Sequence, residues 1–451
     1  MTATEPGPGR RAPLARMARM ATAWRSGPLG VPAFRLLTAG QFTSTVGDYC
    51  YVVALPWLVL SNHGSAAQLG LVLACYGIPR TALITVGGSL ADRLGPRLIM
   101  LCSDAARCAL TAVFAVFAAD HISSLAALAP VAALLGGASA LFMPASMAIM
   151  PSLLEAGQLA AANAVYTGLI QVGSLVGPVL GGVVVATAGP AAAFGVDAAS
   201  YLVSAASLAL MASAAARRSP AGAEAADEVP ADAGQADGPA TAPASVWRLL
   251  LQARILQIIL VVSVTANFAL TGTTEVALPA LAHARYGAGG YGAVLSCIAV
   301  ASLVGTIIVT RLRGIRRPIA ILAVAFMVAA LAIGVAPFVG GLPGVAASMA
   351  VFGLALGVDN VLSLTLLQQW APPAMIGRVM GLLMLAGVGS FPVATAIAGV
   401  LTRHLGPSPV FAISGVLIAA AMLFGLTQRE FRDFGIRARP DAAGELASDP
   451  A

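Results

Sequence analysis

A series of twelve long apolar runs fills the sequence between Phe34 and Thr427. A bilayer core about 30 Å thick needs roughly 20 apolar residues in a helix that rises about 1.5 Å per residue. Only 10% of the residues are charged, against roughly 25% in a typical soluble protein. The sequence therefore predicts an all-α polytopic membrane protein with twelve transmembrane helices.

The expected spans form two groups of six around a stretch rich in Ala, Pro, Gly and acidic residues, which predicts a disordered linker. We expect the spans at residues 34–61, 67–91, 97–118, 124–150, 160–187, 191–216, 254–281, 289–310, 318–338, 343–370, 377–402 and 408–427. The chain then divides into an N-terminal tail at 1–33, a six-helix half at 34–216, a cytoplasmic linker at 217–253, a second six-helix half at 254–427 and a C-terminal tail at 428–451.

The two halves resemble each other at equivalent spans. The tetrapeptide VALP occurs once in the first span and once in the seventh. Gly173 precedes Pro178 by five residues in the fifth span, and Gly387 precedes Pro392 by five residues in the eleventh. A repeat of this kind indicates a duplicated six-helix unit.

Arginine supplies every basic residue, because the chain has no lysine. The arginines gather before the first span and after the second, sixth, eighth and twelfth spans, at Arg10, Arg11, Arg16, Arg19, Arg25, Arg93, Arg97, Arg217, Arg218, Arg311, Arg313, Arg316, Arg317, Arg429, Arg432, Arg437 and Arg439. Only Arg285 and Arg403 fall in loops on the opposite side. This positive-inside pattern predicts that both termini are cytoplasmic. The net charge of +6 therefore reflects topology, and we expect no nucleic-acid partner.

Residues that would carry enzymatic or metal chemistry do not form a recognisable site. The five cysteines are scattered singly within the expected spans, without the spacing of a metal site or a disulfide framework. The four histidines fall in or beside short outer loops, and the sequence contains no G-x-x-x-x-G-K-[ST] loop for ATP. We expect no enzyme activity, metal or cofactor, which leaves a proton gradient as the energy source.

The loop between the second and third spans concentrates charges and a turn. Its residues Gly88, Asp92, Arg93, Gly95 and Arg97 follow the pattern G-x-x-x-D-R-x-G-x-R, which resembles the loop signature of the major facilitator superfamily. Glycine permits a tight turn and close helix approach, and a carboxylate is favoured near a helix N-terminus. The resemblance implies that this loop acts as a latch between the halves and tunes a conformational switch.

The fifth span carries a second motif. Its residues Gly173, Gly177, Pro178, Gly181 and Gly182 follow the pattern G-x-x-x-G-P-x-x-G-G, which resembles the antiporter signature of the same superfamily. Glycines four residues apart present a smooth face for helix packing, and proline removes an amide hydrogen bond and bends the helix. The resemblance implies a drug:proton antiporter.

The sequence around these motifs is similar to the enterobactin (siderophore) exporter-like branch of the superfamily. The similarity runs from about Phe34 to Thr427 and includes Asp48 within TVGDYCYVVALPW. One departure concerns the fourth span, where many drug–proton antiporters carry an arginine that is assigned to proton coupling. That span has no charge here, so the position of the coupling residue stays open.

Ionisable residues inside the spans are the candidate functional residues, since a charge near the bilayer centre costs roughly 2.5–3.5 kcal/mol. They are Asp48, Arg80, Asp104, Arg107, Asp197, Glu275 and Asp359. Asp104 and Arg107 are three positions apart and share one helical face, which predicts a structural ion pair near the cytoplasmic end. We expect Asp197 to lie toward the outer interface in a structural role.

Asp48 and Arg80 lie near mid-membrane on neighbouring spans. They form either a static ion pair or a switchable one, in which Arg80 holds Asp48 ionised in one conformation and releases it in the other. In the superfamily, spans one, four, seven and ten line the central cavity, which favours Asp48, Glu275 and Asp359 as substrate or proton sites. The alternatives are a polar helix–helix contact for Asp359 and an interfacial charge for Glu275.

These features together predict a monomeric secondary transporter of a bacterial inner or plasma membrane. It would export a small amphipathic drug, siderophore or secondary metabolite in exchange for protons, by alternating access. Uptake by proton symport and a transport-inactive receptor or scaffold are the two alternatives. The acidic residues suit an organic cation, whereas Arg80 suits an anionic siderophore, so the charge of the substrate stays open.

Overall fold

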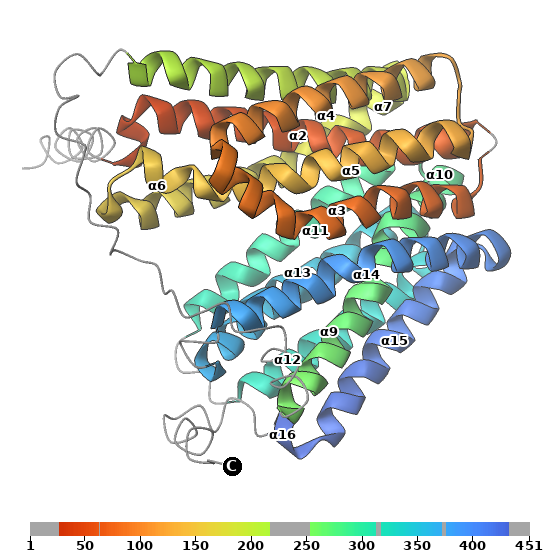
Figure 1. The fold of residues 1–451 in the computed structure, drawn as a ribbon. Coiled ribbons are helices and arrows are strands. Elements are labelled where there is room, and N and C mark those ends of the chain that lie inside the picture. The colour runs from red at the N-terminus through yellow and green to blue at the C-terminus, as the bar shows by residue number, and fades with distance from the viewer. Residues whose placement is uncertain (1–26, 63, 217–252, 313–316, 372–375, 433–451) are drawn as a thin grey trace, which may run out of the picture.

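The computed structural model describes residues 27–62, 64–216, 253–312, 317–371 and 376–432, and these residues form helices joined by short loops (Figure 1). Ten helical stretches among them are long and apolar enough to cross a membrane. One of these, Ala156–Met211, contains two spans. The helix Pro32–Ser61 is not among the ten, because Asp48 and several hydroxyl groups lower its hydropathy. The described part of the chain thus contains the twelve expected transmembrane helices.

The first half consists of α2 (Pro32–Ser61), α3 (Ala66–Leu94), α4 (Pro96–Ala119), α5 (Leu125–Ala148) and α7 (Leu159–Ala216), with the short elements η1 (Pro28–Gly30), α6 (Met150–Leu153) and η2 (Ala156–Gln158). The second half consists of α9 (Arg254–Gly272), η3 (Thr273–Ala277), α10 (Leu278–Arg285), α11 (Gly287–Arg311), α12 (Pro318–Val335), η4 (Ala336–Phe338), α13 (Gly341–Trp370), α14 (Ile376–Leu405), α15 (Pro407–Thr427) and α16 (Arg429–Arg432). The expected linker at 217–253 and most of both tails lie outside the described residues.

Gly-Pro pairs set three of the boundaries between consecutive spans. Gly95, Gly189 and Gly406 have φ angles of 83° to 86°, which glycine adopts without the steric cost that a Cβ atom would bring. Each is followed by a proline that begins the next helix, where its missing N–H costs nothing. The backbone at Gly189 is not helical, so α7 comprises two helices, at residues 159–188 and 190–216, that are joined by this tight turn.

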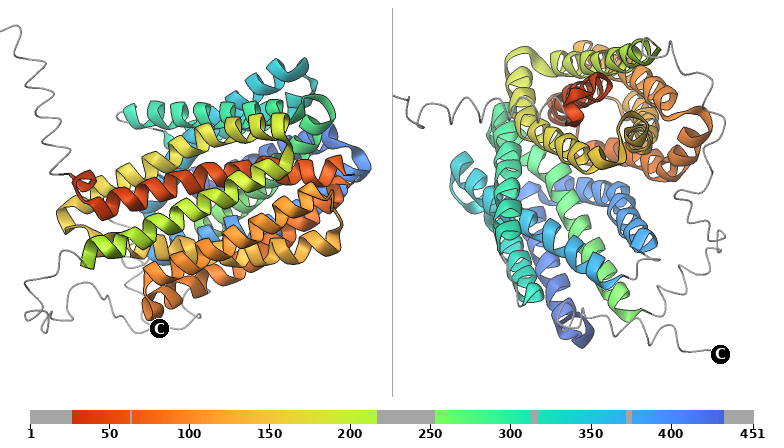
Figure 2. Two further views of the ribbon diagram at one scale, coloured as in Figure 1. Left: turned by 90° about the horizontal axis from the view of Figure 1, so that it is seen from above. Right: turned by 90° about the vertical axis from the view of Figure 1, so that its left-hand side faces the viewer.

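The two halves meet at one end of the molecule and diverge at the other (Figures 1 and 2). We call the end where they meet the closed end; it holds the α2–α3 turn after Ser61 and the end of α10 at Arg285. Glycines make the approach close. A Cβ atom on Gly399 of α14 would lie 3.1 Å from the Cα atom of Gly70 in α3.

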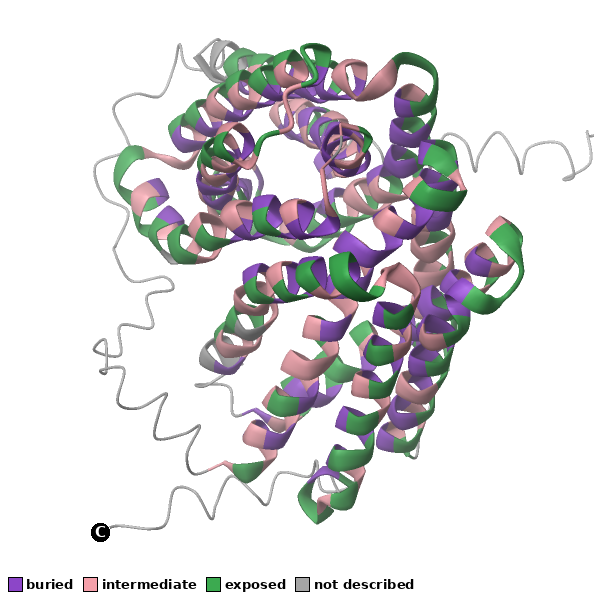
Figure 3. Ribbon diagram, turned by 90° about the vertical axis from the view of Figure 1, so that its right-hand side faces the viewer, coloured by how far each residue is buried: buried purple, intermediate pink, exposed green. Residues whose placement is uncertain are grey.

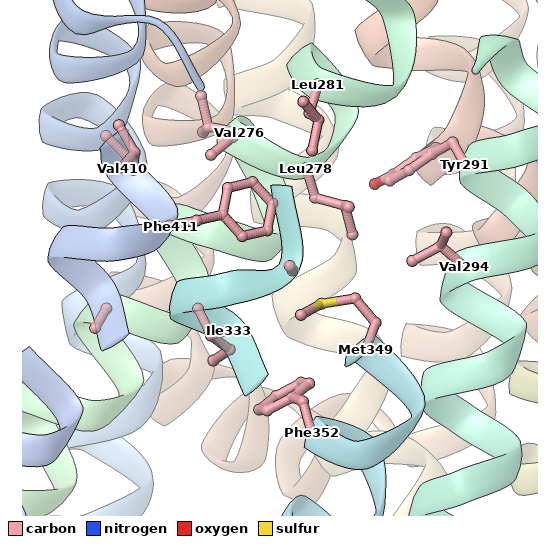
Figure 4. Packing of buried hydrophobic residues seen from close by; sticks show 14 of the residues in the cluster. Val276, Leu278, Leu281, Tyr291, Val294, Ile333, Met349, Phe352, Val410 and Phe411 are labelled. Carbon is pink, nitrogen blue, oxygen red and sulfur yellow. The ribbon is translucent and has the colours of Figure 1, made fainter. Parts of the chain in front are cut away.

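Buried and exposed residues alternate along the helices (Figure 3), and apolar residues occur in both groups. The second half has a packed core near the closed end, where Leu278 of α10, Met349 of α13 and Phe411 of α15 belong to one buried cluster (Figure 4). Large apolar side chains elsewhere face outward, such as Leu331 and Val416, which are 67% and 68% exposed. In a membrane protein these residues face lipid, whose tails are as apolar as the side chains.

Candidate functional site

A cavity of about 520 Å³ lies in the first half of the molecule, with Glu275 of η3 and Phe391 of α14 reaching it from the second half. Its charged lining residues are Asp48, Arg80, Arg107 and Glu275, and its tyrosines are Tyr49, Tyr51, Tyr76, Tyr166 and Tyr201. The structure therefore brings together three of the four predicted substrate or proton residues. Arg107, which we predicted from the sequence as a member of a structural ion pair, also lines this cavity.

Asp48 of α2 accepts a hydrogen bond of 2.5 Å from the hydroxyl group of Tyr201 in α7. Arg80 of α3 lies instead with its guanidinium carbon 5.6 Å from the centre of the Tyr76 ring. No ion pair joins Asp48 and Arg80 in the described residues. The static pair is thus absent from this conformation, and Tyr201 is the partner that the sequence did not reveal.

Arg107 of α4 connects the cavity to the interior of its helical bundle. Its guanidinium forms an ion pair with Asp104, one turn earlier on the same helix. It also lies over two aromatic rings, 4.1 Å from the centre of Phe142 and 4.4 Å from that of Tyr201. Because Tyr201 donates to Asp48, the side chains of Asp104, Arg107, Tyr201 and Asp48 form one continuous chain of contacts.

Asp197 of α7 is completely buried one turn from Tyr201. Neither of its carboxylate oxygens has a hydrogen-bond partner of standard geometry among the described residues. A Cβ atom on Gly47 of α2 would lie 2.7 Å from its Oδ1 atom. The glycine therefore makes the room that this carboxyl group occupies behind the cavity wall.

Glu275 lies in η3, a π-helical turn between α9 and α10 that together form the seventh span. Single π turns inside α-helices are frequent at functional sites. The turn brings Glu275 to the same cavity as Asp48. Glu275 therefore lines an interior cavity, whereas the sequence left open an interfacial position.

Asp359 of α13 does not reach this cavity. It lines a separate cavity of about 360 Å³ inside the second half, together with Asn267 of α9 and Phe326 of α12. Asn267 also lines a cavity of about 420 Å³ between the halves that includes Arg80. The cavity around Asp359 and the cavity around Asp48 are therefore separate, and both adjoin this third cavity between the halves.

No group of three or more His, Cys, Asp or Glu side chains in the described ranges is placed to hold a metal ion.

The loop motif is only partly engaged in this conformation. Arg97 donates from Nε to the carbonyl oxygen of Leu208 at 2.9 Å and from an Nη atom to that of Ala209 at 3.3 Å. It thereby binds backbone carbonyls of α7, in the same half. Asp92 and Arg93 are exposed and form no hydrogen bond or ion pair within the described ranges. The expected latch between the halves is therefore not closed among these residues.

The motif in the fifth span faces two different helices. Cβ atoms on Gly173, Gly177 and Gly181 would lie 2.7 to 3.0 Å from atoms of Thr45, Tyr49 and Cys50 in α2. Gly182 faces α11 of the other half, where a Cβ atom on Gly292 would lie 2.2 Å from the carbonyl oxygen of Pro178. The motif thus packs against the helix that carries Asp48 and, through its other side, against the second half.

Aromatic and polar side chains cover the contact between the halves at the closed end. Trp57 of α2 stacks on Tyr291 of α11 with ring centres 5.8 Å apart and meets the ring of His283 edge-on. The hydroxyl group of Ser61 forms a hydrogen bond of 3.1 Å with Nε2 of His283. These residues join the two halves at the closed end, and their separation by more than two hundred positions hides the contact from sequence reading.

Twelve membrane-spanning helices in two halves, with a charged cavity where the halves meet, are the architecture of a secondary transporter, not of an enzyme. The family model described as "Major Facilitator Superfamily" matches residues 37–358. The chain belongs to the major facilitator superfamily, a family of multi-pass membrane transporters.

Curated relatives are efflux proteins. The chain is 27% identical over 429 residues to the multidrug efflux pump Tap of Mycobacterium tuberculosis, an alignment that covers 91% of this chain and 96% of the relative. It is also 27% identical over 410 residues to the enterobactin exporter EntS of Citrobacter koseri, which covers 89% and 93% of the two chains. The chain is thus similar over most of its length to members of both groups.

Solved structures share the fold. The nucleoside transporter NupG matches with a TM-score of 0.66 at 15% identity, over 88% of this chain and 100% of that one. A bacterial homologue of the iron transporter ferroportin, solved in an inward-facing state, also has a TM-score of 0.66 at 15% identity, over 87% of this chain and 97% of that one. Identities this low establish the arrangement of helices alone.

The glycines of the loop motif lead to a first prediction. A Cβ atom on Gly88 would meet nothing within 4 Å, whereas one on Gly87 would lie 2.9 Å from Pro144 and 3.1 Å from the carbonyl oxygen of Ala140. Close helix approach therefore depends on Gly87, not on Gly88 as the motif suggested. We expect Gly87→Ala to destabilise the protein by about 1–3 kcal/mol, and Gly88→Ala to leave its stability unchanged or raise it by about 0.4–1 kcal/mol.

Thermal unfolding of the two purified variants, followed by tryptophan fluorescence, tests this difference. Equal melting temperatures would contradict the assignment of the close approach to Gly87. A loss of transport in Gly88→Ala at unchanged stability would place the role of Gly88 in another conformation.

Proposed function

We propose that this protein exports a small amphipathic molecule from the cytoplasm in exchange for protons. The observation that carries the proposal is the cavity that Asp48, Arg80, Arg107 and Glu275 line. It offers carboxyl groups that can gain and lose protons beside fixed positive charges that favour their ionised form. The similarity to Tap and EntS supports the direction of transport.

The orientation completes the proposal. Arginine-rich loops belong on the cytoplasmic side, which puts the termini and the linker in the cytoplasm and the closed end outside. The conformation would then be inward-facing, with the outer side sealed around Trp57 and His283. The membrane would be the inner or plasma membrane of a bacterium, and the protein would act as a monomer.

Alternating access would proceed by rocking of the halves around their glycine-lined contacts. In the inward-facing state the substrate enters as Asp48 or Glu275 releases its proton to the cytoplasm. Opening of the closed end then exposes the same carboxyl groups to the outside, where a proton returns and the substrate leaves. One charge moved across 100 mV supplies about 2.3 kcal/mol, enough for roughly a fortyfold gradient per proton.

Proton release from everted membrane vesicles tests this function. The vesicles have an acid interior that a pH-sensitive dye reports, and the added compounds are a panel of cationic drugs and siderophores. We expect at least one compound to release protons, and we expect Asp48→Asn or Glu275→Gln to lower this release by tenfold or more, on the order of the loss when a general acid–base group is removed. Asp120→Asn serves as the matched control, because Asp120 is exposed at the end of α4.

The outcomes separate the alternatives. Release that persists in both Asp48→Asn and Glu275→Gln would contradict the assignment of the proton site. Compound-dependent movement of protons in the opposite direction would indicate symport. No response from a folded, inserted protein to any compound would favour a receptor or scaffold.

A further inference from the structure

The cavity around Asp359 is walled by helices of the second half alone. It measures about 360 Å³ and lies among α9, α12, α13, α14 and α15, within the range of small-molecule sites in proteins. A smaller cavity of about 120 Å³ adjoins it and shares Asn267, Phe326 and Asp359. Most of the lining is apolar, and Met380, Met384 and Met422 contribute three thioethers. Such a wall adapts to large, irregular apolar groups.

Among the described residues, Asp359 supplies the only charge in the lining of these two cavities. Its single hydrogen bond among the described residues comes from the hydroxyl group of Ser363, one turn along the same helix, at 2.6 Å. Asn267 donates its amide to the carbonyl oxygen of Ser263 in its own helix. Arg254, at the start of α9, is engaged at the protein surface with Gln428 and Glu430. The carboxylate therefore has no cationic partner among the described residues.

The cavity around Asp48 differs in its charges, because positive side chains accompany its carboxyl groups. There Arg80 and Arg107 accompany Asp48 and Glu275, so positive and negative charges are equal in number. A carboxylate that lies without a counter-ion in an apolar cavity is costly, because few polar groups replace the water around it. A ligand that carries a positive charge on a large apolar body would remove that cost and contact the Phe326 ring and the thioethers at once.

We propose that the cavity around Asp359 is a binding site for lipophilic organic cations, with Asp359 as the counter-ion. Substrate cation and proton would then bind in different cavities, the cation beside Asp359 and the proton on Asp48 or Glu275. The cavity of about 420 Å³ that contains both Asn267 and Arg80 joins the two sites. The role of this cavity in transport rests on the proposed export function. The binding of a cation to it does not depend on that function.

Equilibrium binding of two probes of the same shape and opposite charge tests the site without transport. Radiolabelled tetraphenylphosphonium and tetraphenylborate are titrated against the purified full-length protein and its variants in detergent. We expect saturable binding of the phosphonium cation that falls by roughly tenfold or more in Asp359→Asn, because a full charge–charge attraction at low dielectric is lost. Asp359→Glu keeps the charge and should restore most of the affinity.

Two further variants locate the binding. Asp48→Asn removes the carboxylate of the other cavity, and Asp120→Asn removes an exposed one at the end of α4. Asp120→Asn should bind the phosphonium cation like the unmodified protein, and Asp48→Asn should keep saturable binding of it. Tetraphenylborate should show no binding that depends on Asp359. Gel filtration and thermal unfolding establish that each variant is folded.

Four results would overturn the proposal. They are unchanged phosphonium binding in folded Asp359→Asn, a loss of binding in Asp48→Asn instead, equal dependence of both probes on Asp359, and no phosphonium binding by the folded, unmodified protein. The proposed export function is tested separately. If the cation site were wrong, siderophore-dependent proton release from vesicles would still establish proton-coupled export.

Discussion

Replacement of Arg107 by methionine is expected to destabilise the protein by about 3–5 kcal/mol, the cost of leaving one partner of a buried ion pair alone. Arg107 and Asp104 are 5% and 0% exposed and form an ion pair with each other. Without the guanidinium, Asp104 keeps a carboxylate in the bundle interior with no cation beside it. The rings of Phe142 and Tyr201 lose the cation that lies between them.

The matched control is Arg80→Met, the same chemical change at a partly exposed arginine without a carboxylate partner among the described residues. We expect it to cost less than about 1 kcal/mol, as for most surface charges. The double variant Asp104→Leu with Arg107→Met removes both charges and should regain most of the stability. Thermal unfolding in detergent measures all three. Equal losses in Arg107→Met and Arg80→Met would show that the ion pair contributes no special stability.

Much of the fold could be predicted from the sequence, because the physical demands of a bilayer are simple. A span needs about 20 apolar residues, and the arginines between the spans fix which loops share a side. The pairs beginning at Gly95, Gly189 and Gly406 mark the helix boundaries for reasons that are local to two residues. The spans in the structure accordingly begin and end within a few residues of the expected positions.

The partners of the buried charges could not be predicted in the same way. Sequence spacing places residues along one helix, and it correctly paired Asp104 with Arg107, which are three positions apart. It cannot say that Tyr201 and not Arg80 contacts Asp48, because that depends on how α2 and α7 rotate against each other. Rotation is set by glycines such as Gly47 and Gly177, whose contacts appear only in the packed bundle.

The separation of Asp359 from the other candidates has a similar origin. The superfamily likeness places spans one, seven and ten around one central space, which suggested a single site. In this conformation the halves diverge away from the closed end, so Asp359 lies within its own half while Glu275 reaches across to the other. The π turn at Thr273–Ala277 contributes, and no simple residue pattern announces such a turn.

Replacement of Gly292 by leucine is expected to cause a large loss of transport, because it prevents the halves from meeting at the closed end. A Cβ atom there would lie 2.2 Å from the carbonyl oxygen of Pro178 and 3.1 Å from the Cα atom of Gly182. Both are backbone atoms of α7, so no side-chain rotation can relieve the clash, and the two helices must separate. Gly289→Leu is the matched control one turn earlier on α11, where a Cβ atom would meet nothing within 4 Å.

Electron-spin distance measurements follow the separation directly. Spin labels on cysteines at Asp120 and Arg403, both exposed at the closed end in opposite halves, report the gap in a background where the five native cysteines are replaced. We expect longer distances and a loss of transport of about tenfold or more in Gly292→Leu, since misplacement of packed elements by about 1 Å commonly costs that much. Gly289→Leu should resemble the unmodified protein in both measurements. If Gly292→Leu kept the short distance and full transport, the α7–α11 contact would not be part of the seal.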